Sequence, residues 1–197
     1  MMEKILSATI AAGILAAGCL APESPATVEV KDESVPKAKE VCVVMQEEIW
    51  LSKPFDVPLD ASLQRFIIRL GEETGVDPKV ILGLIYVESS YNADSIGDDG
   101  HSFGLMQIQR RWHEERIARL NVMDLLNPYD NVAVGVDYLS ELYEKYGDIE
   151  MALVAYNAGP TGAWEHWFSK GLYTSEYSRK VMEASKNIKA LSEDGQQ

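Results

Sequence analysis

Apolar residues recur at helical spacing from Ala61 to near the end of the chain, and this periodicity restricts the fold to packed helices. Leu63, Phe66, Ile67 and Leu70 fall at positions i, i+3, i+4 and i+7 of one such stretch. That spacing places them on a single helical face, which must be buried against another element. The sequence therefore predicts amphipathic helices that share one core.

Residues typical of helix ends divide this region into five expected helices. Asp77 and Pro78 predict the start of the second helix, because Asp caps helices and Pro is tolerated at their first position. Strand signals are sparse and no long repeat is present, so the predicted fold class is all-α with a single helical domain. The expected helices run from Ala61 to a glycine end at Gly71 and Gly75, from Pro78 onward, from Val132 to Tyr146 before Gly147, from Ile149 to Tyr156 after the cap Asp148, and from about Ser175 to Leu191.

Charge and composition exclude several classes of protein. Lys and Arg together number 18 against 31 Asp and Glu, which gives a net charge of -13. A protein that binds nucleic acid normally presents a basic face, so no nucleic-acid partner is expected. Two cysteines cannot form a disulfide framework, and three histidines, none at ligand spacing, argue against a metal site. We expect no metal and no cofactor.

The chain begins with an apolar run, Ile5–Ala17, that is too short to span a bilayer comfortably as a mature helix. Lys4 precedes the run and small residues end it, as in a secretory signal. Residues 15–19 resemble the lipobox of bacterial lipoproteins, which implies that Cys19 is acylated. Leu20, in place of an aspartate, then favours an outer-membrane lipoprotein facing the periplasm. A plain signal peptide and a retained anchor are the alternatives.

A proline-containing spacer follows the apolar run. Residues 20–40 hold three prolines among Glu, Lys, Ser and Ala, a composition that cannot build a core. The predicted organisation is a lipoprotein signal peptide at 1–18, a lipidated cysteine and flexible tether at 19–45, a catalytic domain at 46–192 and a tail at 193–197.

Glu88 is the strongest candidate for a catalytic residue. It follows residues 81–87, the most apolar stretch after the signal, and Ile81, Leu84 and Ile85 share its helical face by spacing. An apolar wall favours the neutral form of a carboxyl group, which can then donate a proton to a leaving oxygen. The alternative is a glutamate at a helix end that faces water.

Two later segments carry polar groups suited to a cleft. Residues 97–108 combine three glycines and two aspartates with a short apolar segment that holds Gln107, and their alternative is a surface turn. Residues 155–160 end with an aromatic ring and an amide before a Gly-Pro break, and their alternative is a helix cap in which Gly159 is left-handed. Trp112, Trp164 and Trp167 can stack on sugars, although the spacing of the last two favours packing.

Four ordered segments resemble the lytic transglycosylase and goose-type lysozyme superfamily, glycoside hydrolase family 23. They are Tyr86-Val87-Glu88-Ser89-Ser90-Tyr91-Asn92, Gly104-Leu105-Met106-Gln107-Ile108, Ala155-Tyr156-Asn157-Ala158-Gly159-Pro160 and Ser175-Glu176-Tyr177-Ser178-Arg179-Lys180-Val181. The resemblance spans about residues 60–185. It implies a lysozyme-like helical domain with a two-lobed substrate cleft that accepts peptidoglycan strands.

The same resemblance implies a role for each matching residue. Glu88 would be the catalytic acid and base, and Tyr177 would help to position it or the sugar. The other residues expected to bind substrate are Asp98, Ser102, Met106 (through its backbone), Gln107, Tyr156 and Asn157.

Two departures from the family pattern leave the reaction outcome open. Many bacterial transglycosylases carry a serine nine residues after the glutamate, where this chain has Gly97. Goose-type enzymes carry one acidic residue at the place of Asp98 and a second at the place of Gln109, so half of their water-positioning pair is missing. The favoured reading is a peptidoglycan lytic transglycosylase that leaves a 1,6-anhydro sugar. The alternatives are a lysozyme using Glu88 with Asp98, and an inactive glycan-binding lipoprotein.

Overall fold

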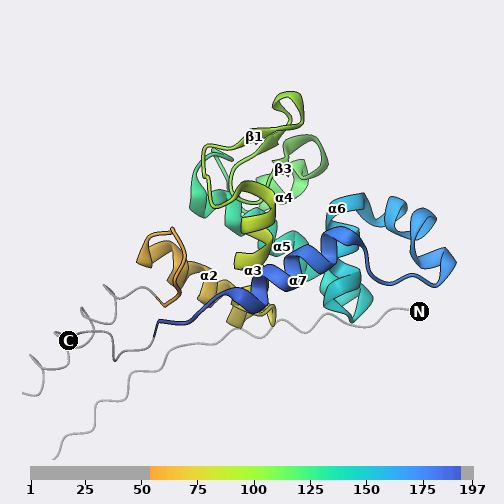
Figure 1. Ribbon diagram of the computed structural model, residues 1–197. Helices are drawn as coiled ribbons and strands as arrows, with labels where there is room; N and C mark the ends of the chain where they lie inside the picture. Colours follow the sequence, from red (N-terminus) through yellow and green to blue (C-terminus); the bar gives the residue numbers. More distant parts are fainter. Residues whose placement is uncertain (1–53, 192–197) are drawn as a thin grey trace, which may run out of the picture. The chain divides into compact units, whose positions relative to one another are not determined.

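A computed structural model describes residues 54–191, and this part of the chain is mainly helical (Figure 1), which confirms the all-α fold class. No helix among these residues is long and apolar enough to cross a membrane. The predicted signal peptide, the Cys19 lipidation site, the whole tether, residues 46–53 of the predicted domain and the tail lie outside the described residues. The helices are α2 (Ala61–Thr74), α3 (Pro78–Ser89), α4 (Glu114–Arg119), α5 (Pro128–Tyr146), α6 (Ile149–His166) and α7 (Glu176–Asn187), with single turns η1 (Asp98–Gly100), η2 (Arg110–Trp112) and η3 (Phe168–Lys170).

Aspartate side chains cap the starts of three of these helices. Asp60 accepts a hydrogen bond from the Leu63 amide at 2.8 Å, and Asp148 accepts one from Met151 at 2.9 Å. Asp77 caps α3, with Pro78 at the first helical position, as the sequence predicts. Each cap satisfies an amide that has no partner inside its helix, so these starts are set by residues only two or three positions apart.

The ends of α2 differ from the prediction. Only Gly75 ends this helix, in the left-handed conformation with φ of 72°. Gly71 lies inside α2, where a Cβ atom would stand 2.7 Å from the Val76 carbonyl and 2.8 Å from the Pro78 ring. This glycine therefore permits the close approach of the next loop and does not stop the helix.

Two other helix boundaries are corrected by the structure. Helix α5 begins at Pro128, four residues before the predicted Val132, because Asn127 caps it. Helix α7 ends at Asn187 rather than Leu191, since the chain becomes extended at Ile188 and Ala190 pairs with Phe55 in an antiparallel bridge. Both differences depend on contacts that helical periodicity does not report.

Helix α6 is longer than predicted. Gly159 breaks the helical path with φ of 69° and ψ of 157°, a conformation that favours glycine. The chain then re-enters a helix at Pro160 and continues to His166, whereas the sequence places the end near Tyr156. Proline is well suited to the first turn of a helix, so the Gly-Pro pair makes a kink and not a terminus.

A small antiparallel sheet follows α3, although strand signals in the sequence are sparse. Its strands are β1 (Ile96–Gly97), β2 (Ser102–Phe103) and β3 (Ile108–Gln109), in the order β1-β2-β3. Ile96 pairs with Phe103, which in turn pairs with Ile108. Each strand has two residues, too short for a periodic signal. Figure 1 shows the sheet close to α4, in the upper part of the view.

Helices α3 and α7 lie far apart in the sequence but pack against each other. Figure 1 shows α7 running alongside α3. Gly83 makes this approach possible, because a Cβ atom there would lie 2.7 Å from the Val181 carbonyl and 2.9 Å from the Ser185 amide. Fully buried side chains on both sides, including Ile81, Leu84, Ile85 and Val181, hold the two helices together.

Candidate active site

A cleft of about 850 Å³ contains the side chain of Glu88, at the C-terminal end of α3. The sheet and η2 supply one part of its lining, including Gln107 and Gln109. Residues 156–162 of α6 supply another part, on both sides of the Gly159 kink. The structure thus brings three of the four predicted motif segments to one cleft.

Glu88 is a partly buried carboxyl group with a strongly altered acidity. Its pKa is raised from 4.5 to about 7, chiefly by burial and to a smaller extent by the nearby charge of Asp98. The Tyr177 hydroxyl donates a hydrogen bond to Glu88 Oε1, which lowers the pKa because it stabilises the carboxylate. Glu88 therefore changes its charge near neutral pH, as an acid that later acts as a base requires.

Tyr177 reaches Glu88 from the first turn of α7, 89 positions along the chain. Its ring is partly buried and packs against the core, and burial followed by the Glu88 charge raises the pKa of Tyr177 well above its ordinary value. The hydroxyl consequently stays protonated and can only donate to the carboxylate. This geometry makes Tyr177 a positioning partner of Glu88.

Tyr156 lines the cleft, and Met106 lies behind it. The Tyr156 hydroxyl donates to the Met106 carbonyl at 2.9 Å, and the Met106 amide donates to Asn131 Oδ1 at 2.8 Å. Met106 is fully buried against Gly135 and does not line the cleft. Both backbone groups of Met106 thus have partners inside the protein, and its contact with a sugar stays a prediction.

Gln107 lines the cleft in a constrained conformation, with φ of 48°. Its amide nitrogen donates to the Gly104 carbonyl at 2.9 Å and to the Ser95 carbonyl at 3.3 Å. Its amide oxygen lies against Gly97, at the place that a Cβ atom of residue 97 would occupy. A side chain on residue 97 would therefore collide with Gln107, which accounts for the glycine at this position.

Asp98 and Ser102 form a hydrogen-bonded group with Gln109. Ser102 Oγ donates to Asp98 Oδ2 at 2.5 Å, and Gln109 Nε2 donates to the same oxygen at 2.9 Å. All three residues line the cleft. Gln109, which the sequence suggested only as a missing carboxylate, in fact holds the remaining carboxylate in place.

Asn157 is exposed in the cleft lining, two residues before the kink of α6 at Gly159. Trp112 also lines the cleft and is 71% exposed, so its indole face is accessible to a ligand. Trp167 packs against the core, as predicted, whereas Trp164 is 62% exposed and lies outside the lining. Only Trp112 among these three remains a candidate for stacking on a sugar.

Asn131 is a residue that the sequence analysis missed. Its side chain accepts from Met106 and donates to the carbonyls of Phe103 and Leu125 at 2.7 and 2.8 Å, so it clamps the loop that carries Gln107. It is fully buried on the same face of α5 as Leu139. A single polar residue at a buried helical position is the signal that could have identified it.

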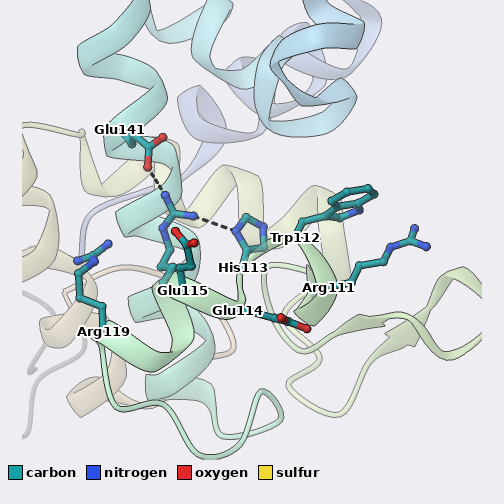
Figure 2. Close-up of a pocket in the computed structure, with 8 residues that line it drawn as sticks. Arg111, Trp112, His113, Glu114, Glu115, Arg119 and Glu141 are labelled. Carbon is teal, nitrogen blue, oxygen red and sulfur yellow. Dashed lines mark hydrogen bonds and ion pairs between the residues drawn. The ribbon is translucent and has the colours of Figure 1, made fainter.

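A charged group on α4 and α5 completes the wall around η2. Arg116 bonds to Asp137 at 2.5 Å, to Glu141 and to His113, and its guanidinium lies 5.0 Å from the Tyr138 ring centre. Figure 2 shows Glu141, His113 and Trp112 around a neighbouring pocket, and these three residues also line the cleft that contains Glu88. The sequence analysis did not predict the partners of Arg116, because they come from separate elements. The described residues contain no group of three or more side chains suited to hold a metal ion.

The chain is similar in sequence to known transglycosylases and to a lysozyme. The family described as transglycosylase SLT domain matches residues 65–173. A transglycosylase of Enterobacteria phage PRD1 is 34% identical over 116 residues, which are 59% of this chain and 39% of the phage protein. Lysozyme g of Struthio camelus is 31% identical over 100 residues, 48% of this chain and 49% of that protein. The chain thus spans half or less of these relatives.

A solved structure has the same fold over a comparable region. The soluble lytic transglycosylase SLT70 of Escherichia coli superimposes with a TM-score of 0.54 and 18% identity, covering 64% of this chain and 25% of that one. This likeness confirms the lysozyme-like helical fold. With more than half of its length matched by the family, the chain belongs to the transglycosylase SLT domain family.

Proposed function

We propose that this protein is a peptidoglycan lytic transglycosylase that cleaves the β-1,4 bond between N-acetylmuramic acid and N-acetylglucosamine. The observation that carries the proposal is Glu88: a partly buried carboxyl group with a pKa of about 7, hydrogen-bonded to Tyr177, in the cleft of an SLT domain. One such group is sufficient when the nucleophile belongs to the substrate and is already held in place.

The reaction uses Glu88 twice. Protonated Glu88 first donates its proton to the glycosidic oxygen, and the bond from that oxygen to C1 of the muramic sugar breaks. The acetamido oxygen of the same sugar stabilises the positive charge that develops at C1. The Glu88 carboxylate then removes the proton of the C6 hydroxyl, whose oxygen attacks C1 and closes the 1,6-anhydro ring. Glu88 ends the cycle protonated, and no water is consumed.

The other cleft residues orient the glycan in this proposal. Tyr177 holds the carboxylate after the first proton transfer. Asn157 presents its amide group to the sugar, and Gln107, whose amide nitrogen is held by the Ser95 and Gly104 carbonyls, packs against it. Asp98 and Ser102 bind hydroxyl groups of the glycan. Tyr156 acts through Met106, whose position behind the cleft wall gives the pair a supporting role.

A second candidate function is hydrolysis, as in a goose-type lysozyme. Asp98 lies in the same cleft, and its charge acts on Glu88. An inverting hydrolase needs a second carboxylate about 6.5–9.5 Å from the acid to activate water. The hydrogen bonds from Ser102 and Gln109 occupy one oxygen of Asp98 and favour a structural or binding role for it. An inactive glycan-binding lipoprotein is the third possibility.

Mass spectrometry of the products separates these functions. Purified peptidoglycan is digested with the protein, and with Glu88→Gln as the matched control. Products lighter by one water than the hydrolytic ones, without reducible ends, establish the transglycosylase. Reducing ends establish the lysozyme and assign the water-activating role to Asp98. An absence of products with the parent protein, together with binding of glycan strands, leaves the binding role.

We also propose that the protein is exported and held on a membrane by acyl chains at Cys19, with the outer membrane facing the periplasm as its location. The support is the lipobox-like sequence at residues 15–19 and the spacer that follows it. Several acyl chains are needed for stable attachment, since a single chain binds reversibly. Metabolic labelling with a fatty acid should mark the parent protein and should not mark Cys19→Ala.

A further inference from the structure

A pocket of about 620 Å³ adjoins the cleft that contains Glu88. Residues of η2 and α4 supply most of its lining, and Figure 2 shows their side chains around it. The residues that line both the pocket and the cleft are Arg111, Trp112, His113, Arg116 and Glu141. Because the two cavities share these residues, a group attached to a ligand in the cleft can enter the pocket.

The wall of this pocket is held in place by the core. Arg116 donates from Nε to Asp137 at 2.5 Å and from Nη2 to Glu141. Arg119 donates to the same oxygen of Asp137 at 2.7 Å. Both acceptors lie on α5, and Ile117 of α4 is buried in the core, so α4 is bound to α5 through charged and apolar contacts. The pocket is therefore a fixed feature of the folded domain.

Among residues 54–191, three charged side chains of the lining have no ion-pair partner. Glu114 and Glu115 are exposed and form no hydrogen bond or ion pair with the described residues. Arg111 donates to the side-chain oxygen of Gln109 at 2.9 and 3.2 Å, and its guanidinium lies 5.0 Å from the Trp112 ring centre. Figure 2 shows Arg111 to one side of the two carboxylates.

These unpaired charges favour a ligand that carries both signs of charge. An ammonium group complements the carboxylates of Glu114 and Glu115. A carboxylate complements Arg111, whose Nη1 forms no hydrogen bond within the described part of the chain. A polyanion is repelled by the two carboxylates, and a neutral sugar uses none of the three charges. The pocket therefore suits a zwitterionic peptide better than a further sugar.

Peptidoglycan carries such a peptide beside the glycan. A stem peptide is attached to the lactyl group of N-acetylmuramic acid, and it contains carboxylates and a diamino acid. The side-chain amine of the diamino acid is a free ammonium group until it is consumed in a cross-link. A strand in the cleft can thus place a stem in the adjoining pocket.

We propose that this pocket binds the stem peptide and selects stems whose side-chain amine is free, with Glu114 and Glu115 facing the ammonium and Arg111 facing a carboxylate. The proposal rests on the proposed function, because the stem belongs to the same substrate. It makes the enzyme selective for strands that are not cross-linked. Exposed ion pairs are weak and are screened by salt, so the preference should be about three- to tenfold at about 0.05 M salt and should disappear near about 1 M.

The first test measures binding to three forms of one preparation of soluble, uncross-linked glycan strands. The full-length Glu88→Gln protein is titrated with untreated strands, with strands whose stem amines have been acetylated, and with strands whose stems have been removed by an amidase. We expect Kd to rise about three- to tenfold on acetylation and at least as much on removal of the stems. Equal Kd values for all three forms overturn the proposal and leave the proposed function standing.

The second test assigns the preference to the pocket. In the Glu88→Gln background, Glu114→Gln combined with Glu115→Gln should bind untreated and acetylated strands equally, because the amides carry no charge. Its Kd for stem-free strands should stay within about twofold, which shows that the cleft is intact. Glu144→Gln, exposed on α5 and outside both linings, is the matched control and should keep the preference.

Cleavage by the parent enzyme separates the two proposals. A parent enzyme that cleaves the strands with the same KM before and after acetylation contradicts the role of the pocket alone. A preference that persists in the variant without Glu114 and Glu115 does the same. Failure of the Glu88→Gln protein to bind any of the three forms, together with an absence of products from the parent, overturns both proposals.

Discussion

At the residue scale, burial and the Tyr177 hydroxyl shift the pKa of Glu88 in opposite directions. Burial favours the protonated acid, whereas the Tyr177 hydroxyl favours the carboxylate. The balance keeps the pKa near 7, where loss and recovery of the proton are both accessible. Neither influence alone suits a residue that must serve as acid and then as base.

Removal of the Tyr177 hydroxyl should disturb this balance in a known direction. Tyr177→Phe removes the hydrogen bond that lowers the pKa of Glu88, so the loss of activity at alkaline pH should move to a pH above that of the parent. The maximal kcat should fall about 10- to 100-fold, because the carboxylate of the second step is less stabilised. The pH profile of kcat measures both effects, with the exposed Tyr173→Phe as control. An unmoved alkaline limb would contradict the assigned contact.

Glu88 should also make stability depend on pH. Between the unfolded pKa of 4.5 and the folded pKa of about 7, the native state keeps the proton of Glu88 and the unfolded state does not. The resulting stabilisation is complete below pH 4.5 and is lost as the pH rises through 7. Relative to Glu88→Gln, the free energy of unfolding of the parent should therefore fall by about 3 kcal/mol across this window. Urea unfolding at several pH values measures it, and parallel curves for the two proteins would refute it.

At the scale of elements, the packing of α7 on α3 carries Tyr177 to Glu88. The two helices approach closely because Gly83 has no side chain. Gly83→Ala should push α7 outward, lowering stability by about 1–3 kcal/mol and reducing activity through loss of the Tyr177 contact. Thermal unfolding measures the stability of each variant, and the rate at which soluble products form from peptidoglycan measures its activity. Lys186→Ala, on the exposed side of α7, should change stability by less than about 0.5 kcal/mol. A Gly83→Ala protein of unchanged activity would show that the helix separation does not matter.

The net charge of -13 is a property of the whole molecule, and it opposes approach to an anionic cell wall. Salt screens such long-range repulsion. If peptidoglycan is the substrate, kcat/KM should rise about two- to threefold between about 0.01 M and 0.15 M salt. The measurement is made at constant pH, and a steady decrease with salt would instead indicate local attraction by a basic part of the cleft.

The sequence by itself determined the features that depend on neighbours along the chain. Asp60, Asp77 and Asp148 cap helices through amides two or three positions away, so these starts can be read directly. Glu88 directly follows an apolar run, and this order along the chain likewise predicts that its carboxyl group lies at the edge of the core. The order of the four motif segments indicated the family, which the comparisons then established.

Only the tertiary structure decided how these pieces meet. Tyr177 bonds to Glu88 across 89 positions, and Asn131 bonds to Met106 across 25. Local sequence patterns also did not predict the hydrogen bond from Gln109 to Asp98 or the contact of Arg116 with His113. They did not predict the continuation of α6 past Gly159. The physical reason is range: capping and periodicity act within one or two turns, whereas acidity and side-chain orientation depend on burial and partners that the folded chain supplies from distant segments.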